Sequence, residues 1–442
     1  MTALDSTIEL VPGRAARQPV PETKDPEIGR AATTAPERRV RPALWVGGAA
    51  LIALMLKLVI AYNTFGTNDV FRFYQFATAL THDGLEETYR EIAAFNHPPL
   101  VAYYLTAIYR LGQQPFAEAA GISFPFLLRL PGIVADFVVV CLFLRLREQE
   151  PQVRLPLWAL LILAISPVSL MVSGFHGNTD PVMVLFLVLA AFAAVRNRPV
   201  WCGIFLALSC QIKIVPVLLL PVYFFFWKER RRLRLFIVPL ALTTVTLWSE
   251  PLLHFPLPFL KNVFGYGSFW GIWGITYWLQ QTGWSEFSQV DFQDLSPAQN
   301  LIGTLLKLLI IGAIVILAWR RRRIESSRGF FASLAFAWLI FFVFSPGIGA
   351  QYLVWAPPFI LLVSPRFFAF CTAGSTLFLF FFYNTISGGL PWFFGLSNGK
   401  RDAEWVPWSI WPWMILGVGL ILLYRKTVGE EASPVSGGAE LR

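Results

Sequence analysis

Apolar runs recur along the chain from residue 42 onward, separated by shorter polar segments. A helix that crosses a membrane needs about 20 predominantly apolar residues, and fewer where its end is buried in protein. By this measure we expect an all-α integral membrane protein with about twelve membrane-spanning helices. The runs cover residues 42–62, 125–146, 155–173, 180–195, 199–212, 214–227, 234–250, 299–319, 329–345, 351–363, 367–383 and 408–424.

Clusters of Arg and Lys stand beside these runs and indicate their orientation. Cytoplasmic loops of membrane proteins carry an excess of Lys and Arg, and with twelve crossings every cluster falls on one side. Both termini are therefore expected in the cytoplasm. The clusters lie at residues 38–41, 145–154, 196–198, 228–234, 320–323, 366 and 425–426.

The charge balance supports this interpretation. Only 14% of the 442 residues are charged and 56% are hydrophobic, which is far from the composition of soluble domains. The formal net charge of +9 comes largely from the clusters beside the spans, so it reflects topology, and no nucleic-acid partner is expected.

Three regions follow from this pattern. Residues 1–41 are rich in Pro, Ala, Thr and charge and predict a disordered cytoplasmic tail. Residues 42–426 form the predicted transmembrane domain, and residues 427–442 a second cytoplasmic tail. We expect a multi-pass protein of a bacterial plasma membrane, with its site on the extracytoplasmic side.

The segment Pro98–Leu111 is long enough to suggest a thirteenth crossing, but that crossing would move every later basic cluster outside. We therefore expect it to lie as a helix at the outer interface. The first outer loop then spans residues 63–124, and a loop of that length is usually functional. Other large outer loops are predicted at residues 251–298 and 384–407.

Three pairs of runs are too short for two full crossings. Between Arg198 and Lys228, at about 1.5 Å per residue, each helix reaches little more than ~20 Å. The turns of these pairs fall near Lys213, at residues 345–351 and at residues 173–180. Irregular backbone at membrane depth persists only where it is buried in protein or lines a watered cavity. The turns therefore predict a cavity that opens outward.

Most candidate site residues lie in these turns: His176, Asn178, Asp180, Lys213, Gln351 and Tyr352. A charge at such depth costs roughly 2.5 to 3.5 kcal/mol, which a function or a partner should offset. Local alternatives stay open. Lys213 can extend to the outer headgroups, the residues before Pro181 can cap its helix, and Gln351 can be structural.

Neither the cysteines nor the histidines indicate a metal site. The four cysteines all lie inside apolar runs and match no CxxC pattern. The four histidines, His82, His97, His176 and His254, show no HxxxH spacing. No cofactor is expected.

Three motifs follow one another in the first half of the chain. Phe65-Gly-Thr-Asn-Asp69 comes after the first span, His97-Pro-Pro-Leu100 begins the interfacial segment, and Leu128-Arg129-Leu-Pro131 opens the second span, with Asp136 deeper in it. With the His-Gly-Asn-x-Asp turn at His176 and the Gln-x-Lys-x-x-Pro segment at Gln211, this order resembles the GT-C superfamily of membrane glycosyltransferases. That superfamily includes dolichyl-phosphate-sugar glucosyl- and mannosyltransferases and bacterial aminoarabinose and mannosyl transferases. The resemblance covers about residues 42–221.

The resemblance implies transfer of one sugar from a polyprenyl-phosphate carrier to an acceptor, with inversion, beside membrane lipids. The acceptor is a glycan, a lipid or a protein. Asp69 would be the catalytic base, and Lys213 and Arg129 would bind the donor phosphate. The residues expected to bind acceptor or sugar are His97, His176, Asn178, Asp180, Gln351 and Tyr352.

One departure from the family concerns Asn68, because many relatives have a second acidic residue there. A divalent metal is therefore possible but not expected. Asp69 itself has a local alternative, since Asp or Asn at this position can cap the following helix.

Two other function classes stay open. A lipid-linked-sugar flippase or a secondary transporter also has submerged polar turns, but such proteins usually show two related halves, and no repeat of the Asp69 or Lys213 segments is found. A membrane polymerase or acyltransferase is the second alternative, which the His176 to Asp180 turn keeps open.

Overall fold

The computed structural model describes residues 42–149, 155–265, 270–288, 295–324, 326–387 and 405–432, and within these it contains helices and connecting segments but no strand. The predicted tail at residues 1–41 lies outside the described residues, as does most of the predicted outer loop at residues 384–407. The all-α prediction is confirmed for the described residues.

Among the described residues, eight helical stretches are long and apolar enough to cross a membrane. They are α1 (Pro42–Asn63), α6 (Phe124–Gln149), α7–α8–η1 (Leu157–His176), α12 (Arg230–His254), α15 (Pro297–Arg320), α16 (Ser327–Phe344), α18 (Pro365–Ile386) and η5–α19 (Val406–Thr427, with α19 itself at Ile410–Ala432). The protein is an integral membrane protein.

The remaining four apolar runs form shorter helices. They are α9 (Asp180–Val195), α10 (Pro199–Ile212), η2–α11 (Val215–Phe226) and η4–α17 (Ala350–Val363). Because only eight stretches have the length of a full crossing, the count of twelve stays a prediction.

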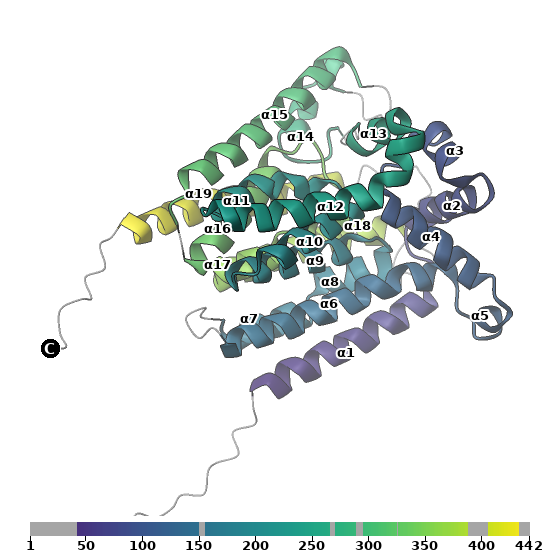
Figure 1. Ribbon diagram of the computed structural model, residues 1–442, viewed down its shortest axis with the longest axis horizontal. Coiled ribbons are helices and arrows are strands. Elements are labelled where there is room, and N and C mark those ends of the chain that lie inside the picture. Colours follow the sequence, from purple (N-terminus) through teal and green to yellow (C-terminus); the bar gives the residue numbers. More distant parts are fainter. Residues whose placement is uncertain are drawn as a thin grey trace, which may run out of the picture. The chain divides into compact units, whose positions relative to one another are not determined.

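The segment between α1 and α6 folds into four helices: α2 (Asn68–His82), α3 (Gly84–Glu91), α4 (Pro99–Gly112) and α5 (Pro115–Ala119). Figure 1 shows them at the end of the helix bundle where α1 finishes, while α1 begins and α19 ends at the opposite end. Pro99 stands in the first turn of α4, where its missing N–H costs nothing. After α12 the chain continues through α13 (Pro256–Phe264), α14 (Gly274–Gln281) and the 3-10 turn η3 (Ser285–Phe287).

The helices differ in how much of their surface the protein itself covers. α10 packs against both α9 and α12, and α16 is buried along most of its length. α1 and α12 instead expose most of theirs, including Leu235, Val238 and Leu242 on α12. Exposed aliphatic side chains of this kind suit contact with lipid tails.

The three predicted turns are irregular backbone, and two of them are enclosed by protein. The chain forms a π-helix, η1 (Leu170–His176), and then Gly177 in the left-handed region. α10 ends at Ile212 and Lys213 follows in an extended conformation, while residues 345–349 are non-helical before η4. Residues 171–181 and 345–350 are all buried. Their polar groups are thus kept away from lipid, as irregular backbone at membrane depth requires.

Candidate functional site

Asp69 lies in the first turn of α2, and Thr67 caps that helix. The Thr67 hydroxyl accepts a hydrogen bond from the backbone N–H of Asp69 at 3.3 Å and donates to the carbonyl of His176 at 2.9 Å. The cap therefore belongs to Thr67, and the Asp69 carboxylate is free to point elsewhere. This cap also ties the start of α2 to the end of η1.

One oxygen of Asp69 collects three donors. Oδ2 lies 3.0 Å from Nε2 of His176, 2.8 Å from Nδ2 of Asn178 and 3.2 Å from Nε2 of Gln351. No described residue hydrogen-bonds to Oδ1, and 37% of the Asp69 side chain stays exposed. The carboxylate is thus held by one oxygen and presents the other.

These neighbours also set the charge state of Asp69. Burial raises its pKa, but the charge and hydrogen bond of His176, the charge of Lys213 and the hydrogen bond from Asn178 outweigh burial and lower the pKa to about 2. Asp69 is therefore ionised over the whole physiological range. An ionised carboxylate accepts hydrogen bonds and can take a proton.

Lys213 and Asp180 form a buried ion pair. Nζ of Lys213 lies 3.0 Å from Oδ1 and 2.9 Å from Oδ2 of Asp180, which is fully buried. Nε1 of Trp355 donates to the same Oδ1 at 2.6 Å. The Lys213 ammonium also lies 4.6 Å from the ring centre of Tyr352. A cation–π contact and an ion pair together fix the direction of the ammonium.

The two charged groups belong to one cluster. Asn178, which binds Asp69, stands two residues before Asp180, which binds Lys213. Gln351, which also binds Asp69, precedes the Tyr352 ring under Lys213. The structure thus brings together seven residues predicted from sequence: Asp69, His176, Asn178, Asp180, Lys213, Gln351 and Tyr352.

Side-chain capping of α9 does not account for the polar residues of the His176 to Asp180 turn. Thr179 occupies the cap position of α9 and makes no side-chain cap bond. Oδ1 of Asn178 accepts from the backbone N–H of Thr179 at 2.7 Å while its amide nitrogen faces Asp69. The polar side chains of this turn are directed to the cluster.

His97 borders the cluster from the α3–α4 connection. It is 8% exposed, and its Nδ1 lies 3.4 Å from the carbonyl of Ile212, the residue before Lys213. Its own carbonyl accepts from the Tyr89 hydroxyl at 2.6 Å. Burial and the charge of Lys213 lower the pKa of His97 to about 4, against the raising effects of the Ile212 carbonyl and Asp69. His97 is therefore neutral at physiological pH.

Arg129 is fully buried, and its guanidinium is occupied by the protein. It bonds the end of α1 and its continuation, where NH2 lies 2.9 Å from the Ala61 carbonyl and 2.5 Å from the Thr64 carbonyl. NH1 reaches the carbonyls of Gly174 and Phe175 in η1 at 3.1 and 3.2 Å. Further bonds join it to the Thr64 hydroxyl and to the carbonyls of Phe65 and Pro125. These contacts make Arg129 a clamp between α1 and η1, and its binding of phosphate stays a prediction.

Two residues of the cluster were not singled out from sequence. Thr67 carries an ordinary cap signal, a threonine just before a helix, which could have identified it. Trp355 carries no local signal, because only the fold brings its indole N–H to Asp180. Among the described residues no group of three or more His, Cys, Asp or Glu side chains is arranged to hold a metal ion.

Comparison with known proteins identifies the class. The family model of glycosyltransferase family 87 matches residues 97–346, more than half of the chain. The chain belongs to glycosyltransferase family 87. This is a GT-C-type family of membrane glycosyltransferases, so the resemblance noted from the motifs is confirmed and the chain is a glycosyltransferase. No curated protein matches the chain.

The match contains His97, Arg129, the His176 to Asp180 turn and Lys213. Asp69 and Gln351 lie outside it, on either side. In the folded protein Asp69 contacts His176 and Asn178 of the matched segment, and Gln351 bonds to Asp69.

Proposed function

We propose that this glycosyltransferase moves one sugar from a polyprenyl-phosphate carrier to an acceptor hydroxyl at the extracytoplasmic face of the membrane, with inversion at the anomeric carbon. The observation that carries the proposal is the Asp69 carboxylate, held through Oδ2 and open at Oδ1, in the same cluster as the Lys213 ammonium. A base and a cation in one cluster are what a single displacement needs.

Asp69 receives the acceptor proton. The acceptor hydroxyl donates a hydrogen bond to Oδ1 and attacks the anomeric carbon as the bond from that carbon to the phosphate oxygen breaks. With a pKa of about 2, Asp69 is a weak base and takes the proton late, when the acceptor oxygen has become positive. The proton ends on Asp69, and the new bond joins the acceptor oxygen to the sugar.

Lys213 stabilises the departing polyprenyl phosphate. Negative charge grows on the phosphate as the bond breaks, and a cation fixed in advance lowers the barrier without reorganising. The ion pair with Asp180 and the Tyr352 ring hold Lys213 in this way. Asp180 is fully buried, so we assign it to orienting Lys213 rather than to binding sugar hydroxyls.

The remaining residues position these two groups. His176, Asn178 and Gln351 orient Asp69, and Tyr352 shapes the surroundings of Lys213. His97 is neutral and lies beside Ile212, where it fixes the end of α10 that carries Lys213. Arg129 clamps the backbone that presents His176, and we assign it to this positioning rather than to direct contact with phosphate.

The test is donor turnover by the purified protein. The protein is incubated in detergent or proteoliposomes with a panel of polyprenyl-phosphate sugars and a mixture of acceptors, and release of polyprenyl phosphate is measured. Turnover of one donor, abolished in Asp69→Asn, supports the proposal. Turnover of nucleotide sugars alone would contradict the carrier, and a product that retains the donor's anomeric configuration would contradict the single displacement.

A further inference from the structure

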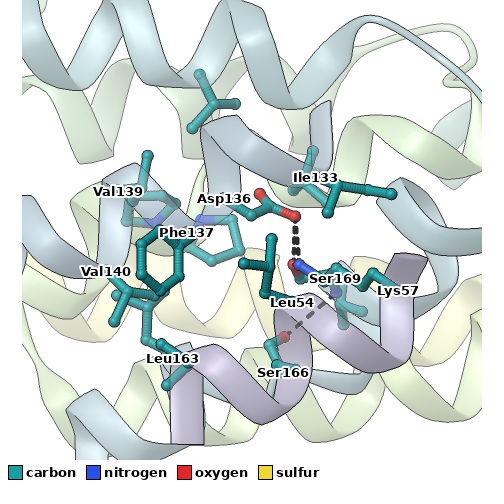
Figure 2. A pocket seen from close by; sticks show the side chains of 18 of the residues that line it. Leu54, Lys57, Ile133, Asp136, Phe137, Val139, Val140, Leu163, Ser166 and Ser169 are labelled. Atoms are coloured by element: carbon teal, nitrogen blue, oxygen red, sulfur yellow. Dashed lines mark hydrogen bonds and ion pairs between the residues drawn. The ribbon is translucent and has the colours of Figure 1, made fainter. Parts of the chain in front are cut away.

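A pocket lies inside the helix bundle, between α1, α6 and the α7–α8 segment, with further walls from α9, α17 and α18. Most of its lining is aliphatic, and its polar residues are joined by hydrogen bonds: Lys57, Asp136, Ser166 and Ser169. Figure 2 shows Lys57 and Asp136 reaching toward each other from α1 and α6. The cavity holds about 50 Å³, which is room for a few waters and too little for a sugar phosphate.

The buried charge of Lys57 is energetically costly at this position. It stands six residues before the end of α1, about 9 Å along the helix, and is 3% exposed. Its ammonium lies 2.6 Å from Oδ2 of Asp136 and 2.5 Å from Oγ of Ser169. A charge inside a spanning helix persists when it is paired, and such pairs commonly have a function.

The ion pair extends into the segment that carries His176. Oδ2 of Asp136 also accepts from Ser169 at 2.5 Å and from the hydroxyl of Ser173. Ser169 ends α8 (Pro167–Ser169), and Ser173 lies in the π-helix η1, three residues before His176. The charged pair is thus bonded to two successive turns of the backbone that leads to the site.

The π-helix is held from two sides. A Cβ on Gly174 would lie 3.4 Å from Cα of Lys57, so η1 and α1 are in close contact there. On the other side Arg129 donates to the carbonyls of Gly174 and Phe175. A π-helix is a rare geometry that is found mostly at functional sites and needs support from its surroundings.

We propose that Lys57, Asp136, Ser169 and Ser173 form a positioning network that fixes the π-helical register of η1 and thereby holds the His176 imidazole against Asp69. Without the network η1 relaxes toward an α-helix, which rotates His176 relative to the fixed backbone of α2. The link from His176 to catalysis rests on the proposed function, whereas the link from the network to His176 does not.

The test measures His176 directly. Purified protein is treated with diethyl pyrocarbonate, which acylates unprotonated imidazole, and modification of each histidine is followed by mass spectrometry. His176 is 3% exposed, while His82 and His254 are exposed and serve as internal references. The variants are Lys57→Met, Asp136→Asn and Ser173→Ala, compared with Ser333→Ala, in which a buried hydroxyl that accepts from Arg321 is removed on α16.

Loss of a buried hydrogen bond to a charged group should raise the rate of His176 modification about tenfold in each network variant, with His82, His254 and the Ser333→Ala protein unchanged. An unchanged His176 rate in Ser173→Ala and Lys57→Met, or an equal rise in Ser333→Ala, would overturn the proposal. Removing one member of a buried pair can unfold a protein, whereas removing both is often tolerated. If all four histidines become modified in Lys57→Met or Asp136→Asn, that variant has unfolded. The proposal is then decided by Ser173→Ala and by the double variant Lys57→Met/Asp136→Leu.

Turnover gives a second readout. In the folded network variants we expect kcat to fall while KM for the donor stays near its wild-type value, because Lys213 is held by other contacts. If the wild type turns over no donor, the proposed function fails while the histidine labelling still decides the network. The two failures are therefore distinguishable.

Discussion

Nε2 of His176 lies 3.0 Å from Oδ2 of Asp69, although 107 positions separate the two residues in the chain. His176 ends a π-helix and Asp69 begins α2, and Thr67 joins these two ends through the His176 carbonyl. The contact lowers the pKa of Asp69 and turns its carboxylate so that one oxygen is left for another partner. Because the Thr67 hydrogen bonds join the backbone at the end of η1 to the start of α2, the fold itself places His176 and Asp69 side by side.

Asp69→Asn should abolish transfer without abolishing donor binding. Asparagine has the shape of aspartate and cannot take the acceptor proton, so kcat should fall by about 10² to 10⁴ while KM for the donor changes little. The measurement is the rate of polyprenyl-phosphate release at saturating donor. Asp83→Asn, an exposed acid at the end of the same helix, is the matched control and should behave as wild type. Normal turnover by Asp69→Asn would refute the role.

Lys213→Met should weaken donor binding. Loss of a hydrogen-bonded charge should raise the donor dissociation constant about tenfold or more. The same change leaves Asp180 buried without its cation, so Asp180→Asn and the double variant Lys213→Met/Asp180→Asn belong in the experiment. Weak binding by the double variant supports a direct contact with phosphate, and recovery in it would mean that Lys213 serves only to neutralise Asp180. Lys261→Met, an exposed lysine on α13, is the control.

Stability should fall in acid because of His97. Its pKa is about 4 in the folded protein and about 6.5 when unfolded, so between these values the unfolded state binds a proton that the folded state does not. Stability is therefore complete above about pH 6.5 and declines as the pH falls toward 4. Thermal unfolding in detergent across this range measures the decline, and His97→Gln should flatten it. His82→Gln is the exposed control. If the unfolding temperature of His97→Gln depends on pH as steeply as that of the wild type, His97 is not the cause of the decline.

Arg129→Met should lower the stability of the protein, with no separate effect on donor affinity. The substitution removes the hydrogen bonds that the guanidinium donates to carbonyls of α1, of the segment after it and of η1, and it should cost at least about 3 kcal/mol of unfolding free energy. Arg72→Met, on the exposed face of α2, should be close to neutral. A variant that unfolds at the wild-type temperature but binds donor weakly would contradict this positioning role and support the phosphate-binding role expected from sequence.

The helices were predictable because their cause is local. Each apolar run coincides with a helix, since a chain segment in lipid must satisfy its own backbone groups whatever surrounds it. The polar residues of the turns could also be found from sequence, because a charged or amide side chain inside apolar sequence is costly wherever it occurs. The number of membrane crossings was harder to predict. Hydropathy shows where an apolar helix lies, but not whether a helix shorter than a full crossing spans the bilayer.

The membrane class, the helix positions and the identity of most polar residues of the cluster therefore follow from the amino-acid sequence. The partners of these residues follow from the packing of the folded protein. Gln351 reaches Asp69 across 282 positions, Arg129 meets backbone carbonyls, and Lys57 pairs with Asp136. Contacts of this kind depend on how separate helices pack, and the free energy of packing is shared among all of them, so no short stretch of sequence contains it.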